Sequence, residues 1–331
     1  MTNFKLTVVS ALFLLITNVE VFGQNDSAYY VTHDDQIHGR IYAIKKYTVL
    51  NYQNKRDDYS FRYLSNTSIG LGVGVTYSWL TVNIAYGLRF VDPNTKGKTN
   101  NLDLQIHGYG KKFILDTFGQ FYKGFYLSPG GKNSFSDQYY YRPDLKMNVI
   151  GASFQYIVNN KRFSFRSSFL QSDWQKKSAG SVLVGIEAYG GNIQSDSTIT
   201  PTLVMEKETI QGETRNEYFQ IGPTGGYAYT WVLKKHFFLT GSAAAGITYG
   251  FKTVTSAGGN VRTSGFSPNT SFRVIAGYNS EKWGLSLLFI NNDIRLAASN
   301  DHRLTVKSGA FRVNYVHRFD VIAKKQKKHR S

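Results

Sequence analysis

The residues of this 331-residue chain that could do chemistry are charged and amide side chains repeated at short intervals. His107 follows Asp103 by four positions, and Gln120 follows Asp116 by four. In an extended strand, residues four apart lie on the same face. An imidazole beside a carboxylate is part of a hydrolase site, but such a site also needs a Ser, and none lies within a few residues of His107. We therefore expect His107 to be a hydrogen-bonded wall residue, and we do not expect an enzyme.

Five arginines share this polar face when each segment follows its own alternation. The predicted set is Arg89, Asp103, His107, Asp116, Gln120, Arg162, Arg166, Arg273 and Arg312. Charges inside a protein need partners or water, so one interpretation is a lattice of ion pairs that braces a wall. The other is a positively charged passage for small anionic or polyhydroxy solutes, because arginines raise the local concentration of anions. Both interpretations stay open.

A second group of candidates lies between positions 123 and 144, where aromatic and basic residues are interleaved. The predicted surface-loop residues are Lys123, Tyr139, Tyr140, Tyr141 and Arg142. Such a surface suits glycans and equally suits the phosphates of lipopolysaccharide. No metal site or cofactor is predicted, because the chain has no Cys and the cluster His33-Asp34-Asp35 lacks the fixed spacing of a strong metal site.

The elements that must position these residues are strands. Apolar residues fill every even position from Leu80 to Phe90, and the pattern returns from Leu102 to Ile106. Similar phasing occurs in Ile69–Tyr77, Phe163–Gln171 and Phe311–Phe319. These runs of about eight to eleven residues are longer than typical strands of a soluble sandwich and suit a membrane crossing. Val82, Ile84 and Leu104 are therefore expected to contact lipid.

The number of strands follows from the connections between them. Thirteen candidates can be placed from residue 38 to residue 319, among them 162–172, with short turns alternating with longer segments. Bacterial barrels made from one chain have an even number of strands, so a further crossing at Thr198–Met205 is expected. The predicted fold is all-β: a transmembrane antiparallel up-and-down β-barrel of about 14 strands, with 12 as the alternative.

The first residues indicate export. Lys5 precedes an apolar run, and Val21 and Gly23 stand at the positions that a signal peptidase requires before Gln24. Asn18 and Glu20 interrupt the run before it reaches the roughly 20 residues of a membrane helix. The expected organisation is a signal peptide at 1–23, an N-terminal periplasmic segment at 24–37, the barrel at 38–320 and a basic tail at 321–331.

Four segments carry a resemblance. They are Lys112–Leu127, Tyr141–Leu145, Lys176–Ser181 and Gly226–Thr230. With them, nearly the whole exported chain resembles a family of exported proteins of Bacteroidota-type bacteria that is known only as a domain of unknown function. The resemblance implies an outer-membrane barrel and brings no activity, ligand or catalytic residue with it.

Together these observations predict a protein of a Gram-negative outer membrane. The expected role is structural or that of a passive, porin-like pore for small polar or anionic solutes. A lipid- or glycan-binding surface protein is the first alternative, and an outer-membrane hydrolase is the second. The expected partners are outer-membrane lipids, lipopolysaccharide and the outer-membrane assembly machinery. Nucleic acid is not an expected partner, although Lys and Arg outnumber Asp and Glu by 39 to 22.

Overall fold

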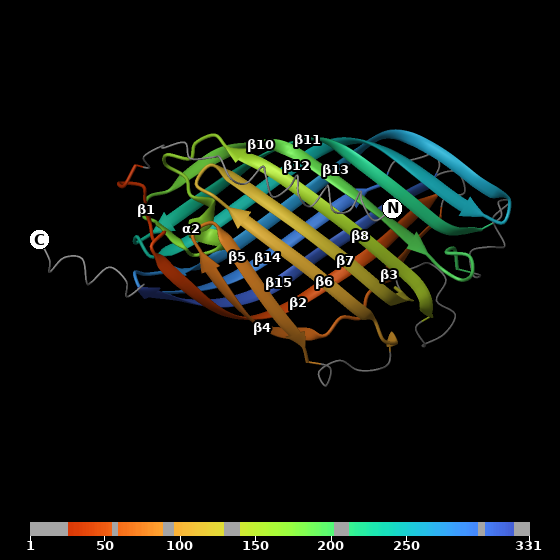
Figure 1. Ribbon diagram of the computed structural model, residues 1–331, viewed down its shortest axis with the longest axis horizontal. Coiled ribbons are helices and arrows are strands. Elements are labelled where there is room, and N and C mark those ends of the chain that lie inside the picture. The colour runs from red at the N-terminus through yellow and green to blue at the C-terminus, as the bar shows by residue number, and fades with distance from the viewer. Residues whose placement is uncertain are drawn as a thin grey trace, which may run out of the picture.

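The computed structural model is dominated by one antiparallel sheet, and it describes residues 26–54, 59–88, 96–128, 140–201, 212–296 and 302–320 (Figure 1). The sheet has 13 strands. They are β2 (Gln36–Asn54), β3 (Tyr59–Leu64), β4 (Ile69–Tyr77), β5 (Leu80–Gly87), β6 (Asn100–Tyr109), β7 (Phe113–Leu127), β8 (Tyr141–Ile157), β10 (Ala179–Gln194), β11 (Glu213–Leu233), β12 (Phe237–Ser256), β13 (Gly259–Asn279), β14 (Trp283–Arg295) and β15 (His302–Asp320). In the described ranges, no helix is long and apolar enough to cross a membrane.

The sheet closes into a barrel because its first and last long strands pair. β2 and β15 run antiparallel from the pair Gln36–Asp320 to the pair Asn54–His302. Each remaining wall strand pairs with the next one around the ring, and β6 joins β5 to β7. β3 continues the line of β4 along β2 and touches β7 only at Tyr63 and Leu64. The predicted class, an all-β antiparallel up-and-down barrel, is confirmed.

Twelve strands close the ring. This number is the predicted alternative, and the preferred count of fourteen is wrong. They are β2, β4 to β8 and β10 to β15, with β3 as an addition at one end. β10 and β11 pair directly from Ala179–Thr230 to Gln194–Arg215, which leaves no place between them for a strand at Thr198–Met205. Residues 198–201 are irregular, and 202–205 lie outside the described ranges.

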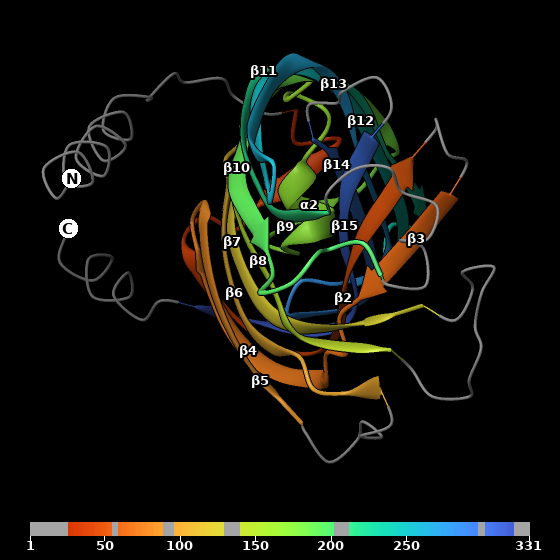
Figure 2. The ribbon, with the colours of Figure 1, turned by 90° about the vertical axis from the view of Figure 1, so that its right-hand side faces the viewer.

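The segment 162–172 is the second correction, because it is not a wall strand. It contains the short helix α2 (Phe165–Phe169), followed by β9 (Asp173–Gln175), which pairs with β1 (Tyr30–Thr32). Figure 2 shows α2 and β9 inside the ring, and every residue from 163 to 175 is buried. We call residues 158–178 the plug segment.

The local sequence explains why α2 is a helix, although the same residues also fit the alternation of a strand. Phe165 and Phe169 are four residues apart, so they fit one face of a helix as well as one face of a strand. Their rings stack with centroids 4.2 Å apart. The hydroxyl of Ser164 accepts a hydrogen bond from the backbone N–H of Ser167 at 3.2 Å, which caps the first turn.

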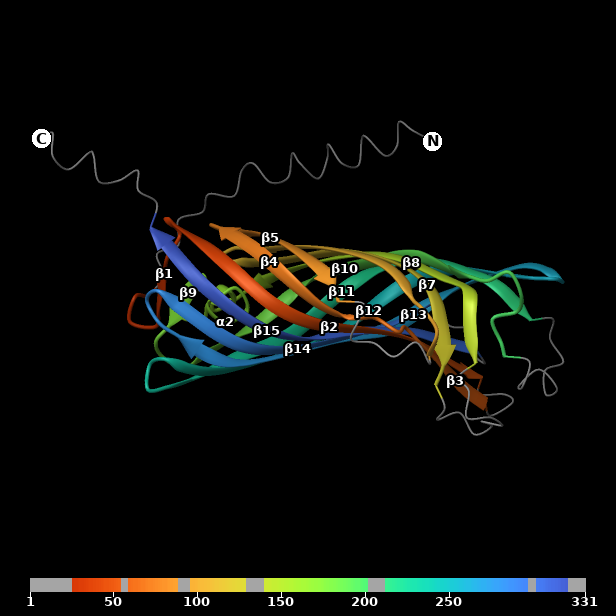
Figure 3. The same ribbon diagram turned by 90° about the horizontal axis from the view of Figure 1, so that it is seen from below.

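The plug segment marks one end of the barrel. Short connections at 78–79, 110–112, 234–236 and 280–282 lie at this end, because each joins the same ends of consecutive antiparallel strands. We call it the inner end; Figure 3 shows α2, β1 and β9 there and β3 at the opposite, outer end. The connection between β12 and β13, at the outer end, is a hairpin whose last pair is Ser256–Gly259.

The outer face of the wall is apolar, as the alternation predicts. Val82, Ile84 and Leu104 are exposed by 58%, 71% and 54%, which places them outside the ring. Their polar neighbours Asn83, Asp103 and Gln105 are less exposed and point inward. The two faces of each strand are therefore assigned correctly in these segments.

The outer half of the lumen is a packed apolar core. Its members come from β2, β3, β7, β8, β10, β11, β14 and β15 and from the segments after β10 and β14, and we call them the outer core. They are Leu50, Phe61, Tyr63, Tyr122, Phe125, Leu145, Met147, Val149, Ile193, Ile199, Tyr218, Ile294, Leu296, Leu304 and Val306, all buried. Large side chains from opposite walls thus fill the ring at this end.

The structure gives the two ends of the barrel wall and part of the segment that precedes it. The first wall strand, β2, begins at Gln36, and the last one, β15, ends at Asp320. Within the segment 24–37, Tyr30–Thr32 pair with β9 of the plug segment. The predicted signal peptide at 1–23 and the basic tail at 321–331 lie outside the described residues.

Candidate functional site

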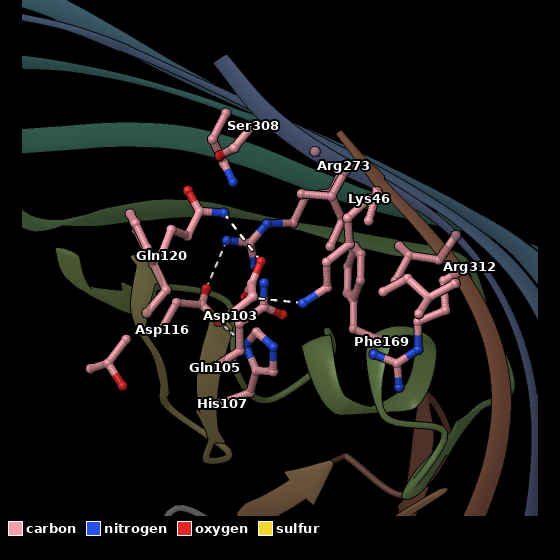
Figure 4. A pocket seen from close by; sticks show the side chains of 18 of the residues that line it. Lys46, Asp103, Gln105, His107, Asp116, Gln120, Phe169, Arg273, Ser308 and Arg312 are labelled. Carbon is pink, nitrogen blue, oxygen red and sulfur yellow. Dashed lines mark hydrogen bonds and ion pairs between the residues drawn. The ribbon is translucent and has the colours of Figure 1, made fainter. Parts of the chain in front are cut away.

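The charged side chains of the lumen gather around a cavity of about 100 Å³. Phe169 and Leu170 of the plug segment form part of its wall. β2, β6, β7, β13, β14 and β15 supply the rest (Figure 4). Six predicted lumen residues line it: Asp103, His107, Asp116, Gln120, Arg273 and Arg312. Strands far apart in the sequence meet here because the closed ring turns all their polar faces toward one axis.

One carboxylate of the cavity, Asp116 on β7, is fully engaged. It lies 2.7 Å from an Arg273 nitrogen and 2.6 Å from His107 Nδ1. The Tyr109 hydroxyl donates to it at 2.8 Å. Arg273 comes from β13, on another side of the ring, so this ion pair crosses the lumen and ties two walls together.

The second carboxylate, Asp103 on β6, is also occupied. Lys46 Nζ from β2 lies 3.0 Å from it, and the Tyr122 hydroxyl donates to it at 3.1 Å. The Gln120 amide makes a longer contact of 3.4 Å. Both acids of the cavity therefore already have cationic partners.

Two further cations of the cavity contact no carboxylate among the residues that the structure describes. Arg40 on β2 donates from Nη2 to the Leu170 carbonyl at 2.5 Å, and its buried Nε has no partner. Arg312 on β15 makes a contact of 3.4 Å with Asn83, and its buried Nε also has no partner. Figure 4 shows Arg312 lying apart from Asp116 and Arg273.

A glycine run sets the position of Arg312. The Arg312 guanidinium carbon lies 4.0 Å from the centre of the Tyr42 ring. The Tyr42 ring lies against Gly72, its partner on β4, where a Cβ atom would come within 2.3 Å of the ring. The glycines of Ile69–Tyr77 thus make room for a large inward side chain, which in turn carries the arginine.

Two cations of the cavity were not among the predicted candidates. Arg40 and Lys46 lie on β2, where the residues on both faces are a mixture of charged and apolar types. Ile41, Ala43 and Lys45 alternate with them, so the sequence does not show which face is inward. No local signal separates them, because Ile44 on the inner face is as aliphatic as Ile41, which is 58% exposed on the outer face.

Two predicted lumen arginines belong to the plug segment and not to the wall. Arg166 is buried within α2, and its Nη2 lies 2.7 Å from Asp34 and 3.0 Å from Asp173. Arg162 lies in the exposed turn before the helix, with its guanidinium carbon 5.1 Å from the centre of the Tyr29 ring. The assignment of both to a strand at 162–172 is wrong for the reason given above. Arg89 lies outside the described residues.

Arg166 is the centre of a latch that holds the plug segment to the N-terminal residues. Burial alone would raise the pKa of the Asp34 carboxyl, but its contacts with Arg166 and Lys111 outweigh burial and lower that pKa. A carboxylate with a lowered pKa stabilises the folded state above its unfolded pKa. The stabilisation is lost as the pH falls through the lowered value, so the latch is complete at neutral pH.

The wall also holds the plug segment. Arg318 on β15 donates to the Gln171 carbonyl at 2.6 Å and to the Asn279 side chain at 2.5 Å. The Ser168 hydroxyl lies 2.6 Å from that of Thr240 on β12. Several polar groups of the wall at the inner end are thus hydrogen-bonded to the plug segment.

The predicted surface-loop candidates do not form one surface. β7 extends to Leu127 and β8 begins at Tyr141, so Lys123 is an exposed wall residue. Tyr140 is partly exposed, and the Tyr141 hydroxyl donates to the Lys98 carbonyl at 2.6 Å. Tyr139 lies outside the described residues.

The prediction that Arg142 is a surface-loop residue is wrong, because Arg142 is only 4% exposed. It makes a two-nitrogen contact with Asp144 at 2.9 Å and 2.8 Å and donates to the Thr198 carbonyl at 2.8 Å. Its contacts join the start of β8 to the segment after β10. This arginine therefore supports the outer end and does not present a binding surface.

The geometry around His107 favours a wall residue. In the part of the chain that the structure describes, His107 Nδ1 contacts Asp116 and Tyr109 but no serine hydroxyl. Over the same residues, no group of three or more His, Cys, Asp or Glu side chains could hold a metal ion.

Comparison with known proteins gives one family. The family model described as Domain of unknown function (DUF4421) matches residues 24–319. None of the curated proteins matches the chain.

Several solved structures share the general form. The outer membrane protease OmpT from Escherichia coli is 8% identical, with a TM-score of 0.41, 91% of this chain covered and 100% of that one. The COG4313 outer membrane channel from Pseudomonas putida F1 is 12% identical, with a TM-score of 0.31 and coverages of 92% and 98%. Ail, the attachment invasion locus protein of Yersinia pestis, is 11% identical, with a TM-score of 0.21 and coverages of 85% and 98%. None of these likenesses is close enough to assign an activity.

Proposed function

We propose that this chain, which belongs to the family described as Domain of unknown function (DUF4421), is an outer-membrane β-barrel with a closed lumen and a structural role, rather than an open pore. The observation that carries the proposal is that buried side chains fill the ring at both ends. The plug segment fills the inner end and the outer core fills the outer end. The charged residues between them mainly brace the wall.

The apolar outer face supports a membrane location. Large apolar side chains of neighbouring strands are exposed side by side. Val73 on β4 pairs with Ile84 on β5, and these residues are exposed by 60% and 71%; Leu287 on β14 pairs with Val313 on β15, and these are exposed by 62% and 45%. A soluble monomer rarely exposes a continuous apolar surface of this extent. Lipids and lipopolysaccharide of the outer membrane would cover it, and an even ring of twelve strands suits a bacterial outer-membrane barrel.

Aromatic residues near the inner end support the same location. Trp231 and Trp283 are exposed by 50% and 40%, close to the short connections 234–236 and 280–282. Trp and Tyr favour the level where lipid headgroups begin. With short turns facing the periplasm, the inner end is proposed as the periplasmic end. Phe311, Tyr315 and Phe319 on the outer face of β15 would meet the assembly machinery.

Electrical recording tests the closed lumen. In a planar bilayer, we expect the purified protein to insert without producing steady single-channel conductance, because neither end of the ring is open. Insertion is checked separately by flotation with vesicles and by resistance of the barrel to proteolysis. A steady conductance from inserted protein would contradict a closed lumen and favour the pore.

Adjacent substitutions on β6 test the membrane location. Leu104→Arg should lower the free energy of unfolding from lipid vesicles by about 2 to 4 kcal/mol if Leu104 lies near the midplane of the bilayer. Gln105→Glu is the control at the adjacent position and should cost much less, because Gln105 faces a polar cavity whose lining holds four cations and only two carboxylates. Equal costs at both positions in vesicles would argue against a lipid-facing wall.

A further inference from the structure

We propose that Arg40 and Arg312 form an internal binding site for a small oxyanion with two negative charges, such as hydrogen phosphate or sulfate. This inference goes beyond the structural role proposed above. It concerns the cavity alone and holds whether or not the barrel conducts.

The charge balance of the cavity is the first argument. Its lining holds four cations, Arg40, Lys46, Arg273 and Arg312, and two carboxylates, Asp103 and Asp116. Counting His107 as neutral, four minus two leaves an excess of two positive charges. Lys46 and Arg273 occupy both carboxylates, so the excess resides on Arg40 and Arg312.

The unused donors are the second argument. Arg40 is 6% exposed and Arg312 is half-buried, and each has a buried Nε without a partner. A buried charged donor without an acceptor is costly, and two like charges in one low-dielectric cavity add to that cost. An oxyanion removes both costs, because planar guanidinium groups match its oxygens with paired hydrogen bonds.

The size of the cavity and its position in the wall favour a free ion over a lipid headgroup as the ligand. A cavity of about 100 Å³ accommodates a small ion with some water. The wall at this level is apolar outside, since Ile41, Phe311 and Val313 next to the two arginines are exposed by 58%, 59% and 45%. A lipid headgroup would lie above or below such a band, so a lipid phosphate is not the expected ligand.

The test uses the full exported chain folded in detergent, where conduction plays no part. Inorganic phosphate is titrated by calorimetry, and the midpoint of thermal unfolding is followed in phosphate and in sodium chloride of equal ionic strength. We expect saturable binding and a larger rise of the midpoint in phosphate. Arg312→Gln should weaken phosphate binding at least tenfold, which corresponds to about 1.4 kcal/mol.

The controls separate the site from general charge effects. Arg215→Gln removes an arginine whose side chain is 44% exposed and paired with Glu217, so it should leave phosphate binding unchanged. Arg40→Gln provides a second variant of the site, in case Arg312→Gln does not fold. Equal midpoints in phosphate and chloride, or binding unchanged in the folded variants of Arg40 and Arg312, would overturn the proposal. Steady conductance would contradict the closed lumen and leave the binding result intact.

Discussion

Replacing Arg166 by Ala should lower the free energy of unfolding by about 3 to 5 kcal/mol, because the change leaves a buried carboxylate without its cation. Asp173 is fully buried, and its remaining contact is a hydrogen bond of 2.6 Å from the Ser164 hydroxyl. Asp34 loses its ion pair at the same time. Reversible unfolding by denaturant from lipid vesicles measures the loss.

The matched control is Arg215→Ala. The ion pair between Arg215 and Glu217 is about half exposed on both sides, and an exposed pair contributes roughly 0 to 1 kcal/mol. A local measurement adds a second criterion: amide hydrogen exchange of residues 163–175 should speed up in Arg166→Ala more than exchange in β11 and β12. If Arg166→Ala costs no more than Arg215→Ala, the latch does not hold the plug segment.

The wall of the barrel could be predicted from the sequence because its signal is local. Alternation in segments such as Ile69–Tyr77 and Leu80–Phe90 depends only on successive side chains pointing to opposite faces. The positions of Val82, Ile84 and Leu104 outside the ring follow from it. Arg40 and Lys46 on β2 were not predicted to face inward. The two faces of this strand do not differ enough in polarity for the alternation to show which one is inward.

The plug segment could not be recognised in this way. Phe163, Phe165 and Phe169 satisfy the period of a strand, and nothing local shows that the chain turns into the ring instead of crossing the membrane. What decides its position is long-range: Arg166 pairs with Asp34, Arg318 donates to Gln171, and β9 pairs with β1. This error also made the strand count wrong. With a false crossing at 162–172 the number of strands was odd, so a further crossing at Thr198–Met205 was needed to make it even.

The ion pair between Asp116 and Arg273 gives the second large prediction. Asp116→Ala should lower the free energy of unfolding by about 3 to 5 kcal/mol, because Arg273 and Asp116 have side-chain exposures of only 13%. His107 and Tyr109 also lose their common acceptor. Asp293→Ala is the control: its pair with Lys307 has exposures of 27% and 39% and should contribute roughly 0 to 1 kcal/mol.

A double substitution identifies which partner carries the cost of Asp116→Ala. Replacing both charges with apolar residues of similar volume, as in Asp116→Leu with Arg273→Met, removes the stranded cation, and such replacements are often close to neutral. We therefore expect the double variant to recover most of the stability that Asp116→Ala loses. If it is as unstable as Asp116→Ala, the carboxylate acts mainly through His107 and Tyr109. In that case the cross-lumen pair is not what braces the wall, and the polar network within β6 and β7 takes its place.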